Sequence, residues 1–360
     1  MKIAINMPIL DKEEIVAVSA VIKSGSLTSS ANLGGKNVQI FEKKFASFVK
    51  SKYAIAVNSG TAALQASLQA LDIKKGDEVI IPSFTFVATA NAVVSIGAKP
   101  VFVDILKENY TMDPDDLQKK ITKRTRAIIL VHLYGNISYI ERISKISKKY
   151  NIPVIEDSAQ SRGSIYKGKH TGPLFEMGCY SMYPTKVMTS GEGGVVVTND
   201  KKFRDKLLMI RNHGMVHGYD SKIFGLNLRL PEINAAIAIV QLKKLPIFLK
   251  LRKRNAELLS KLLSDSEVIL PHERKDETVN WYLYTIATKN RDRLLKKLNE
   301  KGIGAIPYYH IPVHKSPFYK QRTKLPITDW AASHVISVPI HPNVTQKNLE
   351  FTAKIICDVV

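Results

Sequence analysis

The sequence predicts an α/β fold, in which a large, doubly wound, mostly parallel sheet domain is followed by a smaller C-terminal α/β domain. Three observations lead to this prediction. Short apolar runs alternate with amphipathic stretches, as strands alternate with helices in such folds. The runs are continuously rich in Val and Ile, which is typical of parallel strands that are buried on both faces. The length of 360 residues suits two domains of ordinary size.

The large domain contains the clearest elements. We expect helices at 61–71, 113–121 and 140–150 and strands at 78–81, 100–104, 127–131, 153–157 and 194–198. The helix at 113–121 has a typical start, because Asp113 can cap it and Pro114 suits its first turn. Ligands of doubly wound sheets bind beyond the carboxyl ends of the strands. Functional residues are therefore expected just after these strands.

A long helix is expected over 231–263, with an interruption near Pro246, because proline lacks the N–H that a helix interior needs. This interruption is taken as the domain boundary. It gives a large domain at 1–245, with an N-terminal arm, and a smaller domain at 246–360 that contributes to the substrate cleft. The smaller domain is expected to contain a strand around 281–287, a helix around 291–301 and a Pro/His/Tyr-rich loop over 306–319.

The chain is strongly basic, with 53 Lys and Arg against 32 Asp and Glu and a formal net charge of +21. Nucleic acid, acidic metabolites and membrane surfaces are all compatible with such a charge. The basic stretch 243–254 carries apolar residues at helical spacing, so we interpret it as a solvated helix face. The two cysteines, Cys179 and Cys357, are too few for a disulfide scaffold, and no apolar run approaches the roughly 20 residues that span a bilayer. We expect a cytoplasmic protein that binds neither membrane nor nucleic acid.

One segment with functional potential runs from Val57 to Ala63 and passes from an apolar run into a helix. Unpaired amides at a helix N-terminus suit a phosphate group, and Gly60 allows its close approach. When the segment is taken alone, an ordinary helix start capped by Ser59 or Thr61 explains it slightly better.

Two further segments carry a carboxylate and an amine. Asp157 ends the apolar run 153–157, where it fits either a cap of the next element or a site carboxylate that pairs with a cation. Lys186 follows Pro184 in a stretch poor in charge, and a desolvated lysine can form a Schiff base with an aldehyde. A phosphate turn, an acid for a ring nitrogen and an amine for an aldehyde are together what pyridoxal 5′-phosphate (PLP) requires.

The order of these segments resembles the fold-type I PLP-dependent transferases, and more narrowly the DegT/DnrJ/EryC1/StrS family of sugar aminotransferases. The resemblance extends almost from end to end. Its principal motifs are Asn58-Ser-Gly-Thr-Ala62, 76–89, 97–104, 131–135, 153–157, Tyr183-Pro-Thr-Lys186, 191–194, 211–214 and 227–230.

This resemblance implies a role for each matching residue. Lys186 would form the Schiff base with the cofactor and shuttle a proton, and Asp157 would pair with the pyridinium nitrogen. The other implied cofactor contacts are Gly60, Thr61 and Ala62 as the phosphate turn, Ser181 near the phosphate, Phe86 stacked on the ring, Gln160 near the ring hydroxyl, and Asn227 reaching the phosphate from the other subunit. The last contact implies a homodimer with shared active sites.

The implied reaction moves an amino group from an amino acid, by resemblance L-glutamate, to a nucleotide-linked keto-sugar of the NDP-4-keto-6-deoxyhexose type, giving an NDP-amino sugar. The expected substrate contacts are Tyr183, Arg229, Tyr309 and His310, and Arg211 is a further candidate for the donor carboxylate. Two alternatives stay open. The acceptor could be a keto-cyclitol, or the chain could be a non-catalytic regulatory or nucleic-acid-binding protein on the same scaffold.

Three positions depart from the commoner family pattern: Ser158, Arg162 and Val187 stand where Ala, His and Asn are frequent. Lys186 argues against the family branch that carries histidine there and performs dehydration. His213 and His217 are four residues apart, as are His310 and His314, but no neighbouring carboxylate completes a metal site, so no metal is expected.

Overall fold

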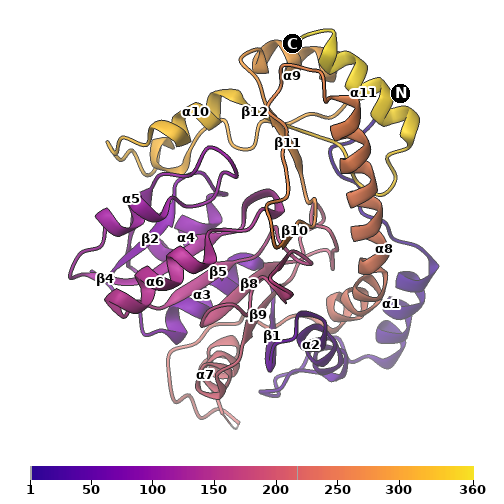
Figure 1. Cartoon of the computed structure of the whole chain (residues 1–360). Coiled ribbons are helices and arrows are strands. Elements are labelled where there is room, and N and C mark those ends of the chain that lie inside the picture. The colour runs from indigo at the N-terminus through magenta and orange to yellow at the C-terminus, as the bar shows by residue number, and fades with distance from the viewer. Residues whose placement is uncertain (1, 217) are drawn as a thin grey trace.

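The computed structural model describes residues 2–216 and 218–360. Its centre is one seven-stranded sheet with the strand order β1-β9-β8-β5-β4-β2-β3 (Figure 1). Strand β9 is antiparallel to both of its neighbours, and the remaining neighbours are parallel. The predicted large, mostly parallel sheet is therefore confirmed.

The helices and strands have the following bounds. The sheet contains β1 (Tyr53–Val57), β2 (Glu78–Pro82), β3 (Lys99–Val103), β4 (Thr125–Val131), β5 (Val154–Asp157), β8 (Met177–Ser181) and β9 (Gly194–Thr198). The α-helices before the smaller part are α1 (Lys12–Ser24), α2 (Lys36–Val49), α3 (Gly60–Ala70), α4 (Ala88–Ser95), α5 (Pro114–Lys119), α6 (Ile140–Tyr150), α7 (Lys201–Arg211) and α8 (Glu232–Leu262), the last of which leads into that part. A short sheet joins β10 (Glu277–Thr278), β6 (Ile165–Tyr166) and β7 (Lys169–His170).

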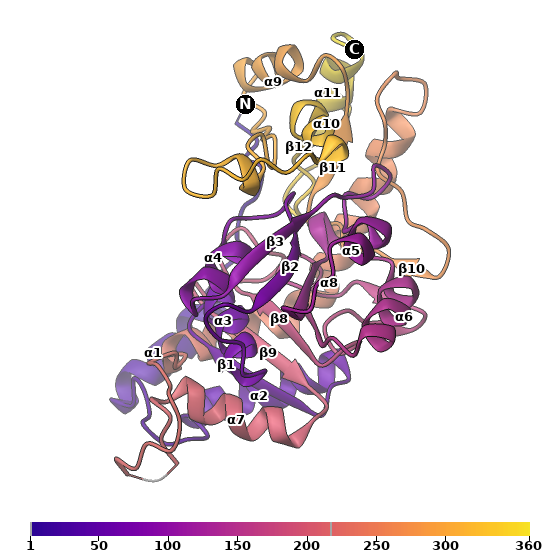
Figure 2. The same ribbon diagram turned by 90° about the vertical axis from the view of Figure 1, so that its left-hand side faces the viewer.

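Successive side chains of each strand point to opposite faces of the large sheet, and helices cover both faces, so both are buried. Ile55 and Val57 pack in one cluster with residues of α3, α4 and α7. Ala54 and Ala56 pack in another with residues of α2 and α8. Figure 2 shows the helices on the two sides of the strands. This double cover leaves the carboxyl ends of the parallel strands as the edge where polar side chains gather.

Helix α8 corrects one prediction. It runs without a break from Glu232 to Leu262 and contains Pro246, so the predicted interruption there is wrong. Leu245 and Phe248, on either side of the proline, are buried in the core, and this packing outweighs the single backbone hydrogen bond that proline removes. The predicted boundary between 245 and 246 falls inside this helix, which packs on the large sheet at its start and on the smaller part at its end.

The smaller part is built on the antiparallel pair β11 (Tyr284–Ala287) and β12 (Val335–Val338). It also contains α9 (Arg291–Glu300), α10 (Pro326–His334) and α11 (Gln346–Cys357), so the predicted small α/β part is confirmed. The N-terminal segment returns to it, because Ile3 forms a parallel bridge with Ile303 (Figure 1). Among the described residues, no helix is both long and apolar enough to cross a membrane.

Candidate active site

The carboxyl ends of β1, β5 and β8 bring three predicted residues to one edge of the sheet. Gly60 follows β1, Asp157 ends β5 and Ser181 ends β8. The turn after β1 packs directly on the end of β8, since a Cβ added to Gly60 would lie 2.8 Å from the Ser181 Cβ. A Cβ added to Gly194, the first residue of β9, would lie 2.2 Å from the Ser59 carbonyl oxygen. Only glycine fits at either position, and the result is a tightly packed turn.

That turn exposes amide groups at the start of α3. Ser59 caps the helix, and its hydroxyl accepts a hydrogen bond of 3.0 Å from the Ala62 amide. The amides of Gly60 and Thr61 have no hydrogen-bond partner in the described part of the chain. Together with the Thr61 and Ser181 hydroxyls, these two amides suit a phosphate group. The Ala62 amide, predicted to belong to the same turn, is already engaged by Ser59.

Asp157 is buried, and its two carboxylate oxygens have different partners. Thr89 in α4 donates from its hydroxyl to Oδ2 at 2.8 Å, and the Ala159 amide donates to Oδ1 at 3.2 Å. Burial raises the pKa of Asp157 above its ordinary value, and these two hydrogen bonds together with the charge of Lys186 oppose that rise. A buried carboxylate of this kind suits a cationic partner such as a protonated pyridine nitrogen. The sequence motifs did not single out Thr89.

Lys186 lies in the loop between β8 and β9 and is half-buried. Its Nζ atom is 4.9 Å from the centre of the Tyr282 ring, and no carboxylate within the described ranges lies at ion-pair distance from it. An amine held against an aromatic ring, rather than by a carboxylate, stays available for a carbonyl group. Tyr282 comes from the segment before β11 and was included only in a predicted strand.

Phe86, Gln160 and Tyr309 border the same edge. The Phe86 ring is 56% exposed, and its centre lies 6.2 Å from that of Tyr309. The Gln160 side chain accepts a hydrogen bond of 2.8 Å from the Tyr134 amide and donates one of 3.2 Å to the Tyr309 hydroxyl. An exposed aromatic face beside a fixed amide side chain fits a planar ring with a polar substituent. The phosphate turn, Asp157, Lys186 and this aromatic edge therefore fit PLP.

Arg162, one of the departures from the family pattern, lies behind the loop that carries Lys186. Its guanidinium donates to the Ser181 carbonyl at 2.8 Å and to the Met188 carbonyl at 3.4 Å, so it joins the end of β8 to the part of the loop just after Lys186. The rings of Phe45 and Tyr180 lie 5.4 and 5.6 Å from it. Burial lowers the pKa of Arg162 to about 10, so it remains charged at neutral pH.

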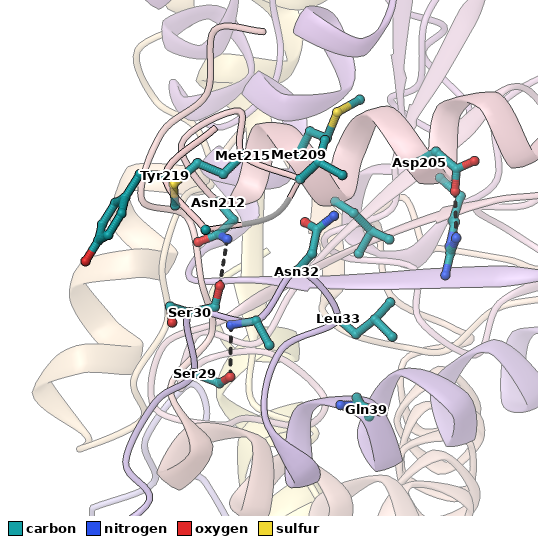
Figure 3. A pocket seen from close by; sticks show the side chains of 15 residues that line it. Ser29, Ser30, Asn32, Leu33, Gln39, Asp205, Met209, Asn212, Met215 and Tyr219 are labelled. Atoms are coloured by element: carbon teal, nitrogen blue, oxygen red, sulfur yellow. Dashed lines mark hydrogen bonds and ion pairs between the residues drawn. The ribbon is translucent and has the colours of Figure 1, made fainter. Parts of the chain in front are cut away.

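Asn227 and Arg229 lie together on the segment between α7 and α8. The Asn227 carbonyl accepts a hydrogen bond of 3.3 Å from Asn58, and Arg229 donates to the Asn212 side chain at 2.8 Å. Asn212 in turn donates to the Ser30 carbonyl at 2.9 Å, on the wall of a cavity of about 970 Å³ (Figure 3). Lys186 and Asp157 do not line this cavity. Asn227 is exposed, and its predicted contact with a second subunit stays a prediction.

Tyr183 and His310, two of the predicted substrate contacts, are both accessible to solvent. Tyr183 is half-exposed next to the lysine loop, and His310 is exposed on the turn that follows Pro307. His314 is buried, and its ring accepts from or donates to the Ser83 hydroxyl at 2.6 Å, so the two histidines do not form a pair. His217 lies outside the described residues.

Arg211 is also committed to the fold. Its guanidinium is buried and holds the Glu42 carboxylate at 2.5 Å, the Ala56 carbonyl at 3.0 Å and the Asn32 carbonyl at 2.8 Å. Both of its terminal nitrogens thus have partners within the fold, and its contact with the carboxylate of an amino donor stays a prediction.

Known proteins are similar to this chain over nearly its whole length, including the segments that form the site. Residues 8–356 match the DegT/DnrJ/EryC1/StrS aminotransferase family. The chain is 38% identical over 325 residues to the UDP-2-acetamido-2-deoxy-3-oxo-D-glucuronate aminotransferase of Pseudomonas aeruginosa, covering 90% of this chain and 89% of that protein. It is 34% identical over 369 aligned residues to a pleiotropic regulatory protein of Geobacillus stearothermophilus, covering 98% of each.

A solved structure agrees with these sequence matches. The structure of DesV from S. venezuelae, in complex with a ketimine intermediate, superposes with a TM-score of 0.93 at 33% identity and covers 98% of each chain. The similarity therefore includes the sheet, the smaller part and the segments that carry Gly60, Asp157 and Lys186.

Proposed function

The chain belongs to the DegT/DnrJ/EryC1/StrS family of PLP-dependent aminotransferases, and we propose that it transfers an amino group from L-glutamate to a nucleotide-linked keto-sugar of the NDP-4-keto-6-deoxyhexose type. The family membership confirms the resemblance found in the sequence. The observation that carries the proposal is the meeting of Lys186, Asp157 and the Gly60 turn at one edge of the sheet.

Each of these groups has a separate task in the proposed reaction. Bound PLP would supply an aldehyde that accepts the amino group and a ring that withdraws electrons. The amides of Gly60 and Thr61 would bind the phosphate, and Asp157 would hold a proton on the ring nitrogen. The amine of Lys186 would move the proton between the substrate α-carbon and C4′ of the cofactor. Phe86 would cover one face of the ring and exclude water from it.

The charge of the chain supports an acidic acceptor. With 53 Lys and Arg against 32 Asp and Glu, the protein attracts a substrate that carries a diphosphate, and such attraction raises the rate of association. A keto-cyclitol lacks this group. Binding of a nucleoside diphosphate, measured by calorimetry without turnover, would favour the nucleotide-linked acceptor.

We also propose that the functional unit is a homodimer with shared sites. Asn227 is exposed and lies beside Asn58, at the end of the strand that leads into the phosphate turn. A side chain at that edge can reach the site of a second copy that packs against this face.

The function is tested by locating the cofactor and following one half-reaction. Protein incubated with PLP is reduced with borohydride and digested, and mass spectrometry should find the added mass on Lys186. Addition of L-glutamate before reduction should remove that adduct and release 2-oxoglutarate. The Lys186→Ala variant should fold normally and show neither result. An adduct on another lysine, or near-normal turnover by the variant, would refute the assignment of Lys186.

A further inference from the structure

The basic stretch 243–254 contains one arginine that does not face solvent. Arg252, in the C-terminal half of α8, is only 3% exposed, whereas Lys250 on the same helix is exposed. No carboxylate in residues 2–216 or 218–360 pairs with the Arg252 guanidinium, and its Nε atom has no hydrogen-bond partner there. Burial lowers the pKa of Arg252 to about 10, so it is still a cation at neutral pH. A buried cation without a carboxylate costs folding free energy, so its hydrogen bonds are candidates for a role besides stability.

The hydrogen bonds of Arg252 lead to both sides of Lys186. On one side, Nη1 donates to the Tyr282 carbonyl at 3.1 Å, and the Tyr282 ring is the one that lies 4.9 Å from the Lys186 Nζ. On the other side, Nη2 donates to the Asn6 side-chain oxygen at 2.6 Å. Asn6 then donates from its amide group to the carbonyl of Thr185 at 2.7 Å. Thr185 immediately precedes Lys186.

The two sides are also joined directly. The Tyr282 and Thr185 hydroxyls lie 3.3 Å apart, at hydrogen-bonding distance. Arg252 and Lys186 line the same small cavity of about 10 Å³. Three segments far apart in the sequence, which carry Asn6, Lys186 and Tyr282, therefore meet around one guanidinium. The planar fork of arginine can hold several acceptors in fixed directions, which a single amine cannot do.

We infer that Arg252 is a positioning residue for Lys186. It fixes the loop through Asn6 and Thr185, and it fixes the ring beneath the lysine amine through Tyr282. This inference rests on the proposed function, because that proposal makes Lys186 the point of cofactor attachment. It assigns to Arg252 no contact with the cofactor or the substrate.

The test compares Arg252→Met with Lys250→Met, an exposed basic residue of the same helix. The first readout is the PLP concentration that half-saturates Lys186, measured by borohydride trapping. We expect Arg252→Met to raise this concentration by about tenfold or more, because small displacements of a reacting group have large effects. The second readout is hydrogen exchange in peptides that cover 182–188, which should become faster. Lys250→Met should change neither value.

Asn6→Ala keeps the test decisive if Arg252→Met does not fold, because Asn6 lies in the N-terminal segment and its loss leaves the core intact. It should weaken attachment in the same direction. In the folded double variant, the two effects should combine to less than their sum, because both act along one path. Arg252→Lys should restore only part of the attachment.

The outcomes separate this inference from the proposed function. If the unmodified protein acquires no adduct on Lys186, both fail. If it acquires the adduct and Arg252→Met does so equally well, with only a lower melting temperature, Arg252 has a structural role and the inference alone is wrong. Weaker attachment with faster exchange at 182–188, at a melting temperature that is unchanged or higher, supports it, because replacing a buried unpaired cation by an apolar side chain does not lower stability.

Discussion

At the scale of single residues, the site contains charges that the fold does not neutralise. Asp157 is buried with a hydroxyl and an amide as its hydrogen-bond partners, and Arg162 and Arg252 are buried against carbonyl groups and aromatic rings. Each arrangement lowers stability relative to an apolar residue of similar size. For Asp157 a cationic ligand would complete the balance, whereas the two arginines hold protein groups in place. Each of the three charges is therefore expected to affect function and stability in opposite directions.

The Asp157→Asn variant tests whether this charge lowers stability while it supports activity. Burial raises the native pKa of Asp157 above the ordinary value of 3.8, so the unfolded chain releases this proton at a lower pH than the native state does. The native state therefore loses stability as the pH rises from that ordinary value to the native pKa, and the loss is complete at neutral pH if the native pKa lies below it. The PLP-free variant should therefore melt at a higher temperature than the PLP-free parent at neutral pH. The difference should shrink as the pH is lowered from the raised native pKa of Asp157 toward the ordinary value of 3.8, and below that value the native and the unfolded carboxyl are both protonated.

The same variant should lose activity, because an amide cannot hold the proton on the ring nitrogen. We expect turnover to fall by at least about a hundredfold, since a buried charge pair contributes several kcal/mol. Calorimetric melting of PLP-free protein and steady-state kinetics of the loaded enzyme supply the two values. Unchanged kinetics would remove Asp157 from its proposed role.

At the scale of elements, the start of α3 depends on its contact with β8. Gly60 is the first residue of the helix, and its Cα faces the Ser181 side chain. The strand below is held by pairing with β5 and β9, so it cannot move away. Because Gly60 has no side chain, the start of α3 can lie directly against β8. The distance between the two elements then sets the position of the Gly60 and Thr61 amides, which are proposed to bind the phosphate.

Gly60→Ala should separate these elements. The added Cβ would lie 2.8 Å from the Ser181 Cβ, and overpacking of this kind costs about 1–3 kcal/mol. We expect a lower melting temperature and an affinity for PLP reduced by about tenfold, measured by titration of the PLP-free protein. Gln65→Ala, one turn further along α3, is the control and should leave the affinity unchanged. Normal PLP affinity in Gly60→Ala would contradict the tight packing of this turn.

The elements also show what the sequence can and cannot predict. The predicted helix at 140–150 coincides with α6 because Ile140, Ile143 and Ile146 mark its buried face. Strand β8 was not predicted, since Met-Gly-Cys-Tyr-Ser lacks the Val and Ile of its neighbours. The break at Pro246 was predicted from a local rule that packing of the whole helix overrides. Local patterns identify most elements, but contacts between distant segments decide where an element such as β8 or the middle of α8 departs from the local rule.

The site follows the same division. Gly60, Asp157 and Lys186 each stand in a short motif whose chemistry is readable from neighbouring residues. Tyr282 and Arg252 carry no such motif, because their place beside the lysine results from the packing of α8 and the smaller part against the sheet. The sequence pattern around Arg252 even indicated a solvated face. Residues that support a site from a distance need the three-dimensional structure to be found.

At the scale of the whole molecule, shared sites make a specific prediction about mixed dimers. Lys186→Ala should be inactive, and Asn227→Ala should be impaired because it removes the side chain proposed to reach the partner's site. A mixed dimer of the two variants would contain one site with both intact residues. When equal amounts of the two variants mix at random, about half of the dimers are mixed, so about a quarter of all sites should be intact.

Co-expression of the two variants with different affinity tags allows purification of the mixed dimer. Its activity per mole of dimer should approach half that of the unmodified protein. A tagged mixed dimer without activity would contradict a shared site, and failure to isolate any mixed species would contradict the dimer itself.

The pairing of β1 with β9 has a consequence for how the protein is made. β1 lies at the edge of the sheet, and β9 is its only strand partner among the described residues, with Tyr53 opposite Thr198. A ribosome that adds about 5–20 residues per second takes roughly 7–30 seconds to pass from one strand to the other. During that interval α2 and α3 are available to pack on the strand, but its hydrogen-bonding edge toward β9 and the glycine turn lack the partners that they have in the finished sheet. Asn6 lacks its hydrogen-bond donor Arg252 for longer still, until α8 has been synthesised. The proposed attachment of PLP to Lys186 would therefore be a late event in biosynthesis, because a chain that holds the cofactor in the finished site must already be translated past β9 and Arg252.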